Sequence, residues 1–401
     1  MKILWVKVGG LWPLNVGGRL RSFHILSELS QRHCVTVVTT HRPDEDPNEL
    51  SKHLPNCERV ISFPHAAPKA GSVQFAGALA RSWTSALPVD LLKWRVPALR
   101  AEVERILGTR GGDICIADFL YAAVNVPWDT SVPVILFAHN VEHMIWRRLA
   151  ANEHRLWRRA LLEVEWRKVR RSEDNACARA QAVIAVSPLD AACLIENTPS
   201  ALVRAIPTGV DTEYFSPNGT AEADGHLVFS GAMDWYPNED AMLFFISEIL
   251  PLIRQQIPNV TMTIVRRNPS ARLRQAGDAA AVGITGTVDD VRAFIEEGAV
   301  YVVPLRIGGG TRLKIFEALS MGKAVVSTSV GAEGLPLLPE QHYVRADDAR
   351  NFSDAVVSLL RDRTRRRALG AAGRDLVQTR YSWPNVAQTF ERHCQEALQK
   401  L

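Results

Sequence analysis

The sequence predicts an α/β protein built from two doubly wound, Rossmann-like domains, and three observations support this prediction. Near-continuous apolar, β-branched runs alternate with helical patterns along the chain, as expected for parallel strands that are buried on both faces. The 401 residues, 47% of them hydrophobic, are enough for two domains that each bury a core. The alternation pauses once, at a polar run with Pro and Gly from Ser216 to His226, and then restarts.

Each half of the chain contributes its own set of predicted strands. In the first half an amphipathic helix at 19–31 follows the first strand, and the predicted strands are MKILWVKV, CVTVVTT, DICIAD, VPVILFAHN and AVIAVS. In the second half the predicted strands are LVFSG, VTMTIV, AVYVVP and AVVST, again separated by helices. We therefore predict domains at 1–215 and 216–381, and a last helix at 382–401 that comes too late to belong to the second sheet.

The composition excludes several classes of protein. No uncharged apolar run reaches the ~18–20 residues that a membrane-spanning helix needs. Lys7 interrupts the apolar start, which favours a first strand over a signal peptide. The six cysteines are scattered, as in proteins of a reducing cytosol. A net charge of +4 is too small to imply nucleic acid. We expect a cytoplasmic protein.

The segment VYVVPLRIGGGTRLKIFEALSMGKAVVST, from Val300 to Thr328, carries the strongest functional signal. A strand ends near Pro304, a glycine-rich loop follows, and a helix then runs to about Met321 and stops at Gly322. Glycines let backbone N–H groups approach a ligand closely, and a helix N-terminus favours anions. The loop residues expected to line the ligand are Gly308, Gly309, Gly310 and the helix N-cap Thr311.

Three charged side chains follow this loop on the predicted helix. Arg312 and Lys314 place two positive charges in the first turn, where cations oppose the helix dipole, so we expect a phosphate or diphosphate to join them. Glu317 follows Lys314 by three residues on the same helix face, and its carboxylate is suited to accept both hydroxyls of a ribose. The alternative is a surface ion pair between Lys314 and Glu317, which would contribute little.

His139 lies directly after a predicted strand, at the sheet edge where ligands bind. Single histidines are more often structural, but Asn140, Glu142 and His143 lie beside this one. The sequence motif H-x-x-E-H also matches the inverted zinc-peptidase signature, which requires both histidines one turn apart on a helix. Because the first histidine follows a strand, we keep zinc only as an alternative. Neither Asp118 nor Glu142 is assigned as a nucleophile.

Three further glycines are candidates for ligand binding. Gly17 and Gly18 lie before a helix that opens with Arg19, and they form either an adaptable loop at a strand's carboxyl edge or a simple structural turn. Gly231 follows the first strand of the second half and lets the backbone approach a ligand.

Three motifs together resemble a known family: GGGTRLKIFEALSMGKAVVST, FSGAMDWYPNED and IPTGVDTEYFSP. The chain is similar to the retaining glycosyltransferases of family four, which have the GT-B fold, and within them to a bacterial group associated with exopolysaccharide synthesis. The resemblance implies two domains that face each other across a cleft. It implies transfer of a sugar from a nucleotide-diphosphate donor to a saccharide or lipid-linked saccharide acceptor, with retained configuration, no metal and no cofactor.

The resemblance also implies roles for the candidate residues. Glu317 would contact the ribose, and Arg312 and Lys314 would face the diphosphate; with His139, near the donor sugar, they are the candidate catalytic residues. The candidate donor-binding residues are Gly231, Arg267, Val288 through its backbone, Gly308, Gly309, Gly310 and Thr311. The candidate acceptor or cleft residues are Gly17, Gly18, Asn140 and Glu142. The last helix would return to the first domain.

Two positions depart from the family pattern. Gly309 stands where the family has its first glutamate, and Arg266 stands where these relatives usually have glycine. Nucleotide-sugar epimerases and hydrolases share this fold, so such an enzyme stays open as an alternative. A non-catalytic sugar-nucleotide binding protein stays open as well, because Gly309 replaces the glutamate.

The segment from Ile145 to Arg171 is the candidate for peripheral membrane contact. It carries nine Lys/Arg, three Glu and three Trp. It is either a basic amphipathic helix near anionic lipid or a solvated helix face with a core stripe, and the latter is favoured because we find no second anchor.

Overall fold

The computed structural model describes residues 1–14, 17–69, 71–109, 111–231, 236–265, 270–307 and 313–399. The chain divides into two compact units. Unit 1 is Met1–Pro207 together with Val386–Leu401, and unit 2 is Thr208–Asn385. The first boundary therefore falls before the predicted linker.

The polar run from Ser216 to His226 is a loop of unit 2 rather than the linker that we predicted. Within it, Glu222 accepts from Arg366 at 3.0 Å and lies 3.5 Å from Lys323. Both cations are buried, so they need a nearby carboxylate, and Glu222 supplies it. The run is therefore attached to unit 2 by ion pairs and is not a flexible linker between the units.

Unit 1 contains a parallel sheet flanked by helices on both faces. The strand order is β3-β2-β1-β4-β5-β6-β7, and every pairing is parallel. The strands described are β1 (Lys2–Lys7), β2 (Cys34–His41), β3 (Arg59–Pro64), β4 (Ile114–Asp118), β5 (Val134–Ala138), β6 (Ala182–Ala185) and β7 (Val203–Ala205). The strands β4 and β5 are buried throughout and β1 is buried from Ile3 onward, which explains their near-continuous apolar sequences.

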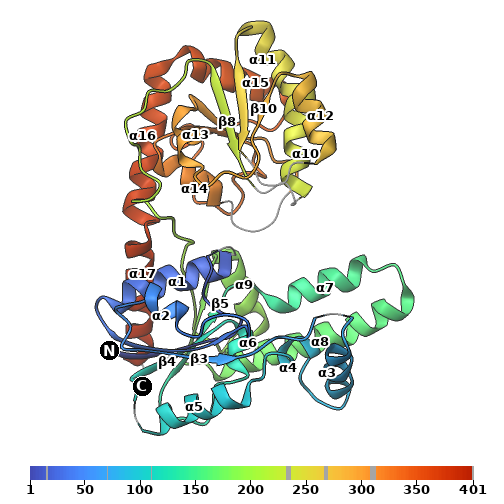
Figure 1. The fold of residues 1–401 in the computed structure, drawn as a ribbon, viewed down its shortest axis with the longest axis vertical. Helices are drawn as coiled ribbons and strands as arrows, with labels where there is room; N and C mark the ends of the chain where they lie inside the picture. The colour runs from blue at the N-terminus through green and yellow to red at the C-terminus, as the bar shows by residue number, and fades with distance from the viewer. Residues whose placement is uncertain are drawn as a thin grey trace. The chain divides into compact units, whose positions relative to one another are not determined.

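The helices of unit 1 follow the βα order of a doubly wound domain. They are α1 (Gly17–Ser30), α2 (Glu49–His53), α3 (Val73–Trp83), α4 (Val89–Leu92), α5 (Pro97–Gly108), α6 (Leu120–Ala123), α7 (Glu142–Asn152), α8 (Leu156–Arg179) and α9 (Pro188–Asn197). Helices α1 and α2 cover one face of the sheet and α5 the other (Figure 1). The predicted single helix from Ile145 to Arg171 is in fact two helices, α7 and α8, which project from the sheet as a hairpin (Figure 1).

Unit 2 repeats the same plan with a second parallel sheet. Its strand order is β10-β9-β8-β11-β12-β13. The strands described are β8 (His226–Ser230), β9 (Thr261–Val265), β10 (Gly283–Ile284), β11 (Val300–Val303), β12 (Ala324–Ser327) and β13 (Val344–Arg345). The helices described are α10 (Tyr236–Phe244), continued by a π-helical turn (Phe245–Ile249) and α11 (Leu250–Gln256), then α12 (Ala271–Ala279), α13 (Arg292–Glu297), α14 (Leu313–Ser320), α15 (Ala349–Arg361), α16 (Arg363–Arg380) and α17 (Trp383–Leu398).

Helix α14 ends as its sequence predicts. The helix is described to Ser320, and Gly322 then adopts a φ of 70°. This left-handed conformation favours glycine and closes the helix C-terminus. The glycine therefore fixes where β12 begins.

Helix α17 starts in unit 2, but its residues from Val386 onward belong to unit 1. Phe390 is fully buried and packs against Trp5 of β1 and Phe137 of β5, with ring centroids 5.6 Å and 5.0 Å away. Glu391 accepts from Arg32 at 2.9 Å. The helix thus completes the core of unit 1 beneath the strands that bear its candidate site.

The two segments where the chain passes between the units run side by side within unit 2. Val210 N donates to Tyr381 O at 2.8 Å, and Val210 and Ser382 form a parallel bridge. A Cβ on Gly209 would lie 2.4 Å from the ring of Trp383, so only glycine permits this approach. In the described residues no helix is long and apolar enough to cross a membrane.

We expect Phe390→Ala to lower the free energy of unfolding of unit 1 by about 3–5 kcal/mol, because it removes a fully buried ring from between two others. Arg392→Ala, on the exposed side of the same helix, is the control and should change stability little. Urea denaturation of the full chain measures both. Equal stabilities would show that α17 does not support unit 1.

Candidate functional site

Ligands of doubly wound sheets bind at the carboxyl ends of the strands, where the strand order reverses. In unit 2 this reversal lies between β8 and β11, and in unit 1 it lies between β1 and β4. Gly231 directly follows β8, and the segment leading to α14 follows β11. Gly231 and the helix that carries Lys314 and Glu317 therefore lie at this point of unit 2.

Lys314 lies in the first turn of α14 and reaches across to the neighbouring strand and helix. Its Nζ donates to Asn238 Oδ1 at 2.7 Å and lies 4.3 Å from the centre of the Phe229 ring. Phe229 belongs to β8, and Asn238 to α10. The ammonium group is thus held over the end of β8, at the reversal of strand order.

Gly231 allows this placement because it has no side chain. A Cβ added there would lie 2.5 Å from Lys314 Nζ and 3.1 Å from Asn238 Nδ2. Any other residue would therefore displace the lysine. This is a physical reason for glycine beyond the backbone approach that the sequence predicts.

Glu317 is partly buried on α14, one turn after Lys314. Burial raises the pKa of Glu317 to about 7, and the charge of Lys314 opposes this rise. Among the described residues no hydrogen-bond donor reaches its carboxyl group, and Lys314 bonds Asn238 instead of forming the alternative ion pair. The carboxyl group is therefore available to accept hydroxyl groups and takes up a proton near neutral pH.

The remaining predicted donor-site residues are Val288, which the structure describes, and a group outside the described ranges. Val288 lies in the connection between β10 and α13, partly buried against the core of unit 2. The predicted residues that lie outside the described ranges are Arg266, Arg267, Gly308, Gly309, Gly310, Thr311 and Arg312.

The reversal point of unit 1 holds a buried ion pair. Lys7 ends β1 and Asp118 ends β4, and the two residues are register partners with Nζ and Oδ2 3.1 Å apart. Trp5 Nε1 donates to Asp118 at 2.9 Å, and Lys7 donates to Ser22 at 2.9 Å. Burial alone raises the pKa of Asp118, but Lys7 and His139 outweigh it and hold the pKa well below its usual range.

His139, at the end of β5, is fixed on both ring nitrogens. Nε2 lies 2.7 Å from Asp118 Oδ1, and Nδ1 lies 3.1 Å from the guanidinium of Arg21. Burial lowers the pKa of His139 to about 3, although Asp118 opposes the fall, so the ring is neutral. Because Arg21 can only donate, Nδ1 accepts and Nε2 carries the proton. A ring contact to a donor sugar therefore requires exchange of one of these bonds.

The Gly17-Gly18 pair opens α1 instead of preceding it, because the helix begins two residues earlier than we predicted. A Cβ on Gly18 would lie 2.6 Å from the ring of Phe119, whereas Gly17 has no neighbour within 4 Å. Phe119 in turn stacks on His139, with centroids 3.7 Å apart and planes 6° from parallel. Gly18 therefore supports the position of His139.

Glu142 and Asn140 lie together at the start of α7. Tyr121 Oη donates to Glu142 Oε2 at 2.8 Å, and Asn140 Nδ2 donates to Glu142 Oε1 at 3.2 Å. Burial raises the pKa of Glu142. His143 pairs with Glu173, whereas His139 pairs with Asp118. His139 also precedes the helix, so the context of the zinc-peptidase motif is absent from this part of the structure. The described residues contain no group of three His, Cys, Asp or Glu that is arranged to hold a metal.

Sequence reasoning missed the contributions of Lys7, Arg21 and Asn238. In the sequence Lys7 only interrupts an apolar run. Because a lysine inside a buried strand requires a carboxylate partner, its burial in β1 implies such a partner. Asp118 ends another buried strand, so opposite charges at two strand ends were the signal for this pair.

Comparison with known proteins defines the class of the chain. Residues 17–214 match the family described as Glycosyltransferase Family 4, and residues 224–362 match the family described as Glycosyl transferases group 1. The structure of HepE from Anabaena, solved in complex with UDP, matches with a TM-score of 0.66 over 99% of this chain and 100% of HepE, at 15% identity. The chain has the GT-B architecture and is a glycosyltransferase.

It belongs to the glycosyltransferase families that these two matches describe. A Klebsiella pneumoniae protein, described as an uncharacterised 44.6 kDa protein in the cps region, is 21% identical over 371 residues, or 89% of this chain and 90% of that protein. A Mycobacterium tuberculosis protein described as GDP-mannose-dependent alpha-(1-6)-phosphatidylinositol monomannoside mannosyltransferase is 28% identical over 216 residues, which are 47% of this chain and 54% of that protein.

The raised pKa of Glu317 predicts how the stability of unit 2 depends on pH. The folded state binds this proton more tightly than the unfolded chain, so stability falls as pH rises from 4.5 to about 7. We expect Glu317→Gln to remove this loss, so that the fall in Tm between about pH 5 and about pH 8 is smaller than in the parent. Glu248→Gln, at an exposed position, is the control. An unchanged fall in Glu317→Gln would show that this carboxyl has an ordinary pKa.

Proposed function

We propose that this glycosyltransferase moves a sugar from a nucleotide-diphosphate sugar to a saccharide or lipid-linked saccharide, with retention and without a metal or cofactor. A nucleotide donor is supported by the UDP bound to HepE and by the GDP-mannose dependence in the name of the mycobacterial relative. A role in exopolysaccharide or cell-envelope glycan synthesis is supported by the cps region of the Klebsiella relative.

The donor site in this proposal is the reversal point of unit 2, and the placement of Lys314 carries the argument. Its ammonium group is held beside Gly231 by Asn238, and Lys314 lies in the first turn of α14, which directly follows Gly308–Arg312 in the sequence. Negative charge develops on the leaving diphosphate as the glycosidic bond breaks, and Lys314 and Arg312 stabilise it electrostatically. Glu317 accepts the ribose hydroxyls.

The carboxylates of unit 1 support a route without a covalent glycosyl-enzyme. Asp118 is ionised, but it is fully buried and its oxygens already accept from Trp5, Lys7 and His139. Both oxygens of Glu142 are hydrogen-bonded, and its raised pKa disfavours the nucleophilic form. A nucleophile must present a free carboxylate to the sugar. We therefore infer front-face transfer through an oxocarbenium-like state.

The test is incubation of the purified chain with UDP- and GDP-sugars, with and without saccharide acceptors and with and without EDTA. NMR of the product gives the configuration of the new bond. The proposal expects a retained anomer, formed only with acceptor and unaffected by EDTA. A donor epimer or free sugar formed equally without acceptor would favour the epimerase or hydrolase, and restoration of activity by zinc would contradict metal independence.

We expect Lys314→Ala to weaken binding of UDP or GDP roughly ten- to hundredfold, because a charge-assisted contact to phosphate is lost. Arg350→Ala removes an exposed cation of the same unit and is the control. Isothermal titration calorimetry measures both variants, and thermal unfolding verifies that they are folded. Parental affinity in Lys314→Ala would place the diphosphate elsewhere.

We also propose that the hairpin of α7 and α8 contacts an anionic membrane surface, where a lipid-linked acceptor would lie. Large apolar side chains are exposed along it, including Leu156 at 82%, Trp157 at 61% and Leu149 at 51%. The segment from Ile145 to Arg171 carries nine basic residues and three Glu, so charge and apolar exposure occur together.

A vesicle flotation assay tests this contact. We expect the parent to float with vesicles rich in phosphatidylglycerol but not with phosphatidylcholine alone, and the double variant Leu156→Ser, Trp157→Ser to stay unbound. Leu189→Ser, which changes an exposed leucine on α9, should behave as the parent. Equal flotation of all three proteins would exclude the hairpin as the contact.

A further inference from the structure

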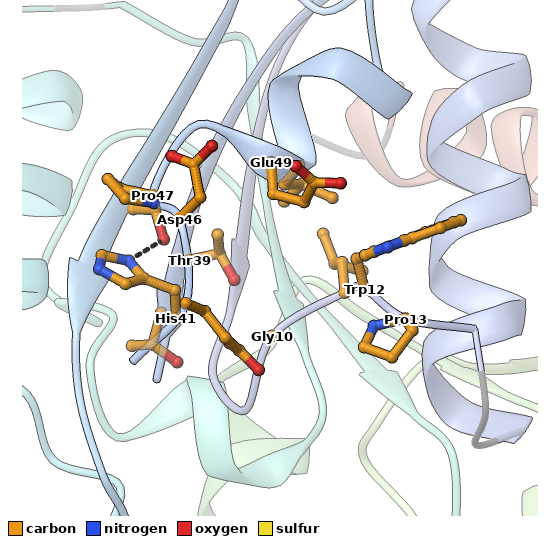
Figure 2. Close-up of a pocket in the computed structure, with 13 residues that line it drawn as sticks. Gly10, Trp12, Pro13, Thr39, His41, Asp46, Pro47 and Glu49 are labelled. Atoms are coloured by element: carbon orange, nitrogen blue, oxygen red, sulfur yellow. Dashed lines mark hydrogen bonds between the residues drawn. The ribbon is translucent and has the colours of Figure 1, made fainter. Parts of the chain in front are cut away.

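A cavity of about 280 Å³ opens in unit 1 beside the carboxyl ends of β1 and β2 (Figure 2). It lies outside the network around His139. One side of its lining is apolar, and the other carries hydroxyl and carboxylate groups. The lining residues used below are Leu11, Trp12, Thr39, Asp46, Glu49 and Leu50.

Thr39 of β2 lines this cavity and is 1% exposed. Its Oγ1 is buried and has no hydrogen-bond partner among the described residues. Figure 2 shows Thr39 between Asp46 and His41 on one side and Trp12 on the other. A buried hydroxyl without a partner costs free energy, so its retention at a cavity wall points to a ligand that bonds it.

The carboxylates at the same cavity define what that ligand must offer. Lys52 bonds both Asp46, at 3.1 Å, and Glu49, at 2.8 Å. Hydrogen bonds from Asn48 and Lys52 lower the pKa of Asp46, and those from Lys52 and His53 lower the pKa of Glu49, so both are ionised. Ionised carboxylates only accept hydrogen bonds and repel anions. Lys52, which lies between the two carboxylates, repels cations in turn. The matching ligand is therefore neutral and rich in hydroxyl groups.

The apolar side of the cavity is held in place. The Trp12 ring stacks on His53, with centroids 3.7 Å apart and planes 18° from parallel. Leu11 and Leu50, which also line the cavity, are buried. A pyranose ring presents hydroxyls at its edge and C–H groups on its faces, and this lining offers a surface for each.

A second cavity, of about 440 Å³, adjoins the first. The two share the lining residues Gly10, Thr40, His41 and Glu45. The second cavity adds Trp94 as a further aromatic wall. It also adds the cations Arg19, Arg42 and Lys69, so the selection against charged ligands concerns the first cavity alone. Together they provide room for more than one sugar ring.

We propose that the cavity at Thr39 binds a neutral sugar residue of a saccharide acceptor, with Thr39, Asp46 and Glu49 bonding its hydroxyls. The inference rests on the proposed transfer reaction and adds the site and the charge class of the acceptor. The proposal also predicts that the cavity discriminates against negatively charged sugars, because the carboxylate of a uronate would face those of Asp46 and Glu49.

The first experiment is Thr39→Val in the full chain, with Thr36→Val as the control. Thr36 is a buried threonine of the same strand that lines neither cavity. We expect the KM for acceptor to rise about three- to tenfold in Thr39→Val, with the KM for donor unchanged. Its Tm should not fall, because an unpaired buried hydroxyl is removed, so a loss of acceptor affinity cannot be ascribed to unfolding.

The second experiment measures binding without any reaction. Saturation-transfer NMR uses neutral methyl hexosides and methyl glucuronide as probes. We expect the parent to bind the neutral probes and not the glucuronide, Thr39→Val to weaken the neutral signal, and Asp46→Asn to reduce discrimination against the glucuronide.

The outcomes separate this inference from the proposed function. If sugar transfer proceeds but Thr39→Val has the parental acceptor KM, or if the parent binds the glucuronide as well as the neutral probes, the cavity is not this subsite. If no donor is bound or turned over while the neutral probes bind in a Thr39-dependent way, the transfer proposal fails and the neutral-sugar site stands.

Discussion

The ion pair between Lys7 and Asp118 is the constraint on which the functional edge of unit 1 depends. The two residues end neighbouring parallel strands in register, and burial removes the solvent that would otherwise stabilise each charge. Separating a buried pair of this kind typically costs about 3–5 kcal/mol, because one charge is left without compensation. Asp118 also fixes the tautomer of His139, on which Phe119 stacks. The buried ion pair at the ends of β1 and β4 thus also orients His139, which follows β5.

The inner strands could be predicted from the sequence, and the sheet edges could not. Strands buried on both faces are almost uninterrupted apolar runs, so all nine predicted strands are present. The edge strands β3 and β10 are short or half-exposed, and β7 and β13 are only three and two residues long. These edge strands form because the neighbouring strand offers backbone hydrogen-bond partners, and their own sequences lack the apolar run of an inner strand. The linker was misplaced because a polar run can serve to satisfy buried cations, as Glu222 does for Arg366 and Lys323.

The residues of the candidate site could likewise be predicted from the sequence only in part. The positions of His139 and Glu317 in the fold could be predicted because each lies at a fixed offset from a recognisable strand or helix start, whereas their roles stay predictions. The partnership of Lys7 with Asp118 depends on strand order and register, which join residues 111 positions apart and leave no local pattern. The unpaired hydroxyl of Thr39 is still harder to foresee, since a threonine in a buried strand usually finds a backbone acceptor.

The path of α17 affects the order in which the chain acquires its structure during translation. Unit 1 begins at Met1, yet its core includes Phe390, which leaves the ribosome only after all of Thr208–Asn385. At common elongation rates that interval is roughly ten to forty seconds. Throughout it, Trp5 and Phe137 lack the ring that covers them in the finished molecule. The first domain to be synthesised is therefore the last to be completed, and the nascent chain exposes an apolar surface that chaperones can bind.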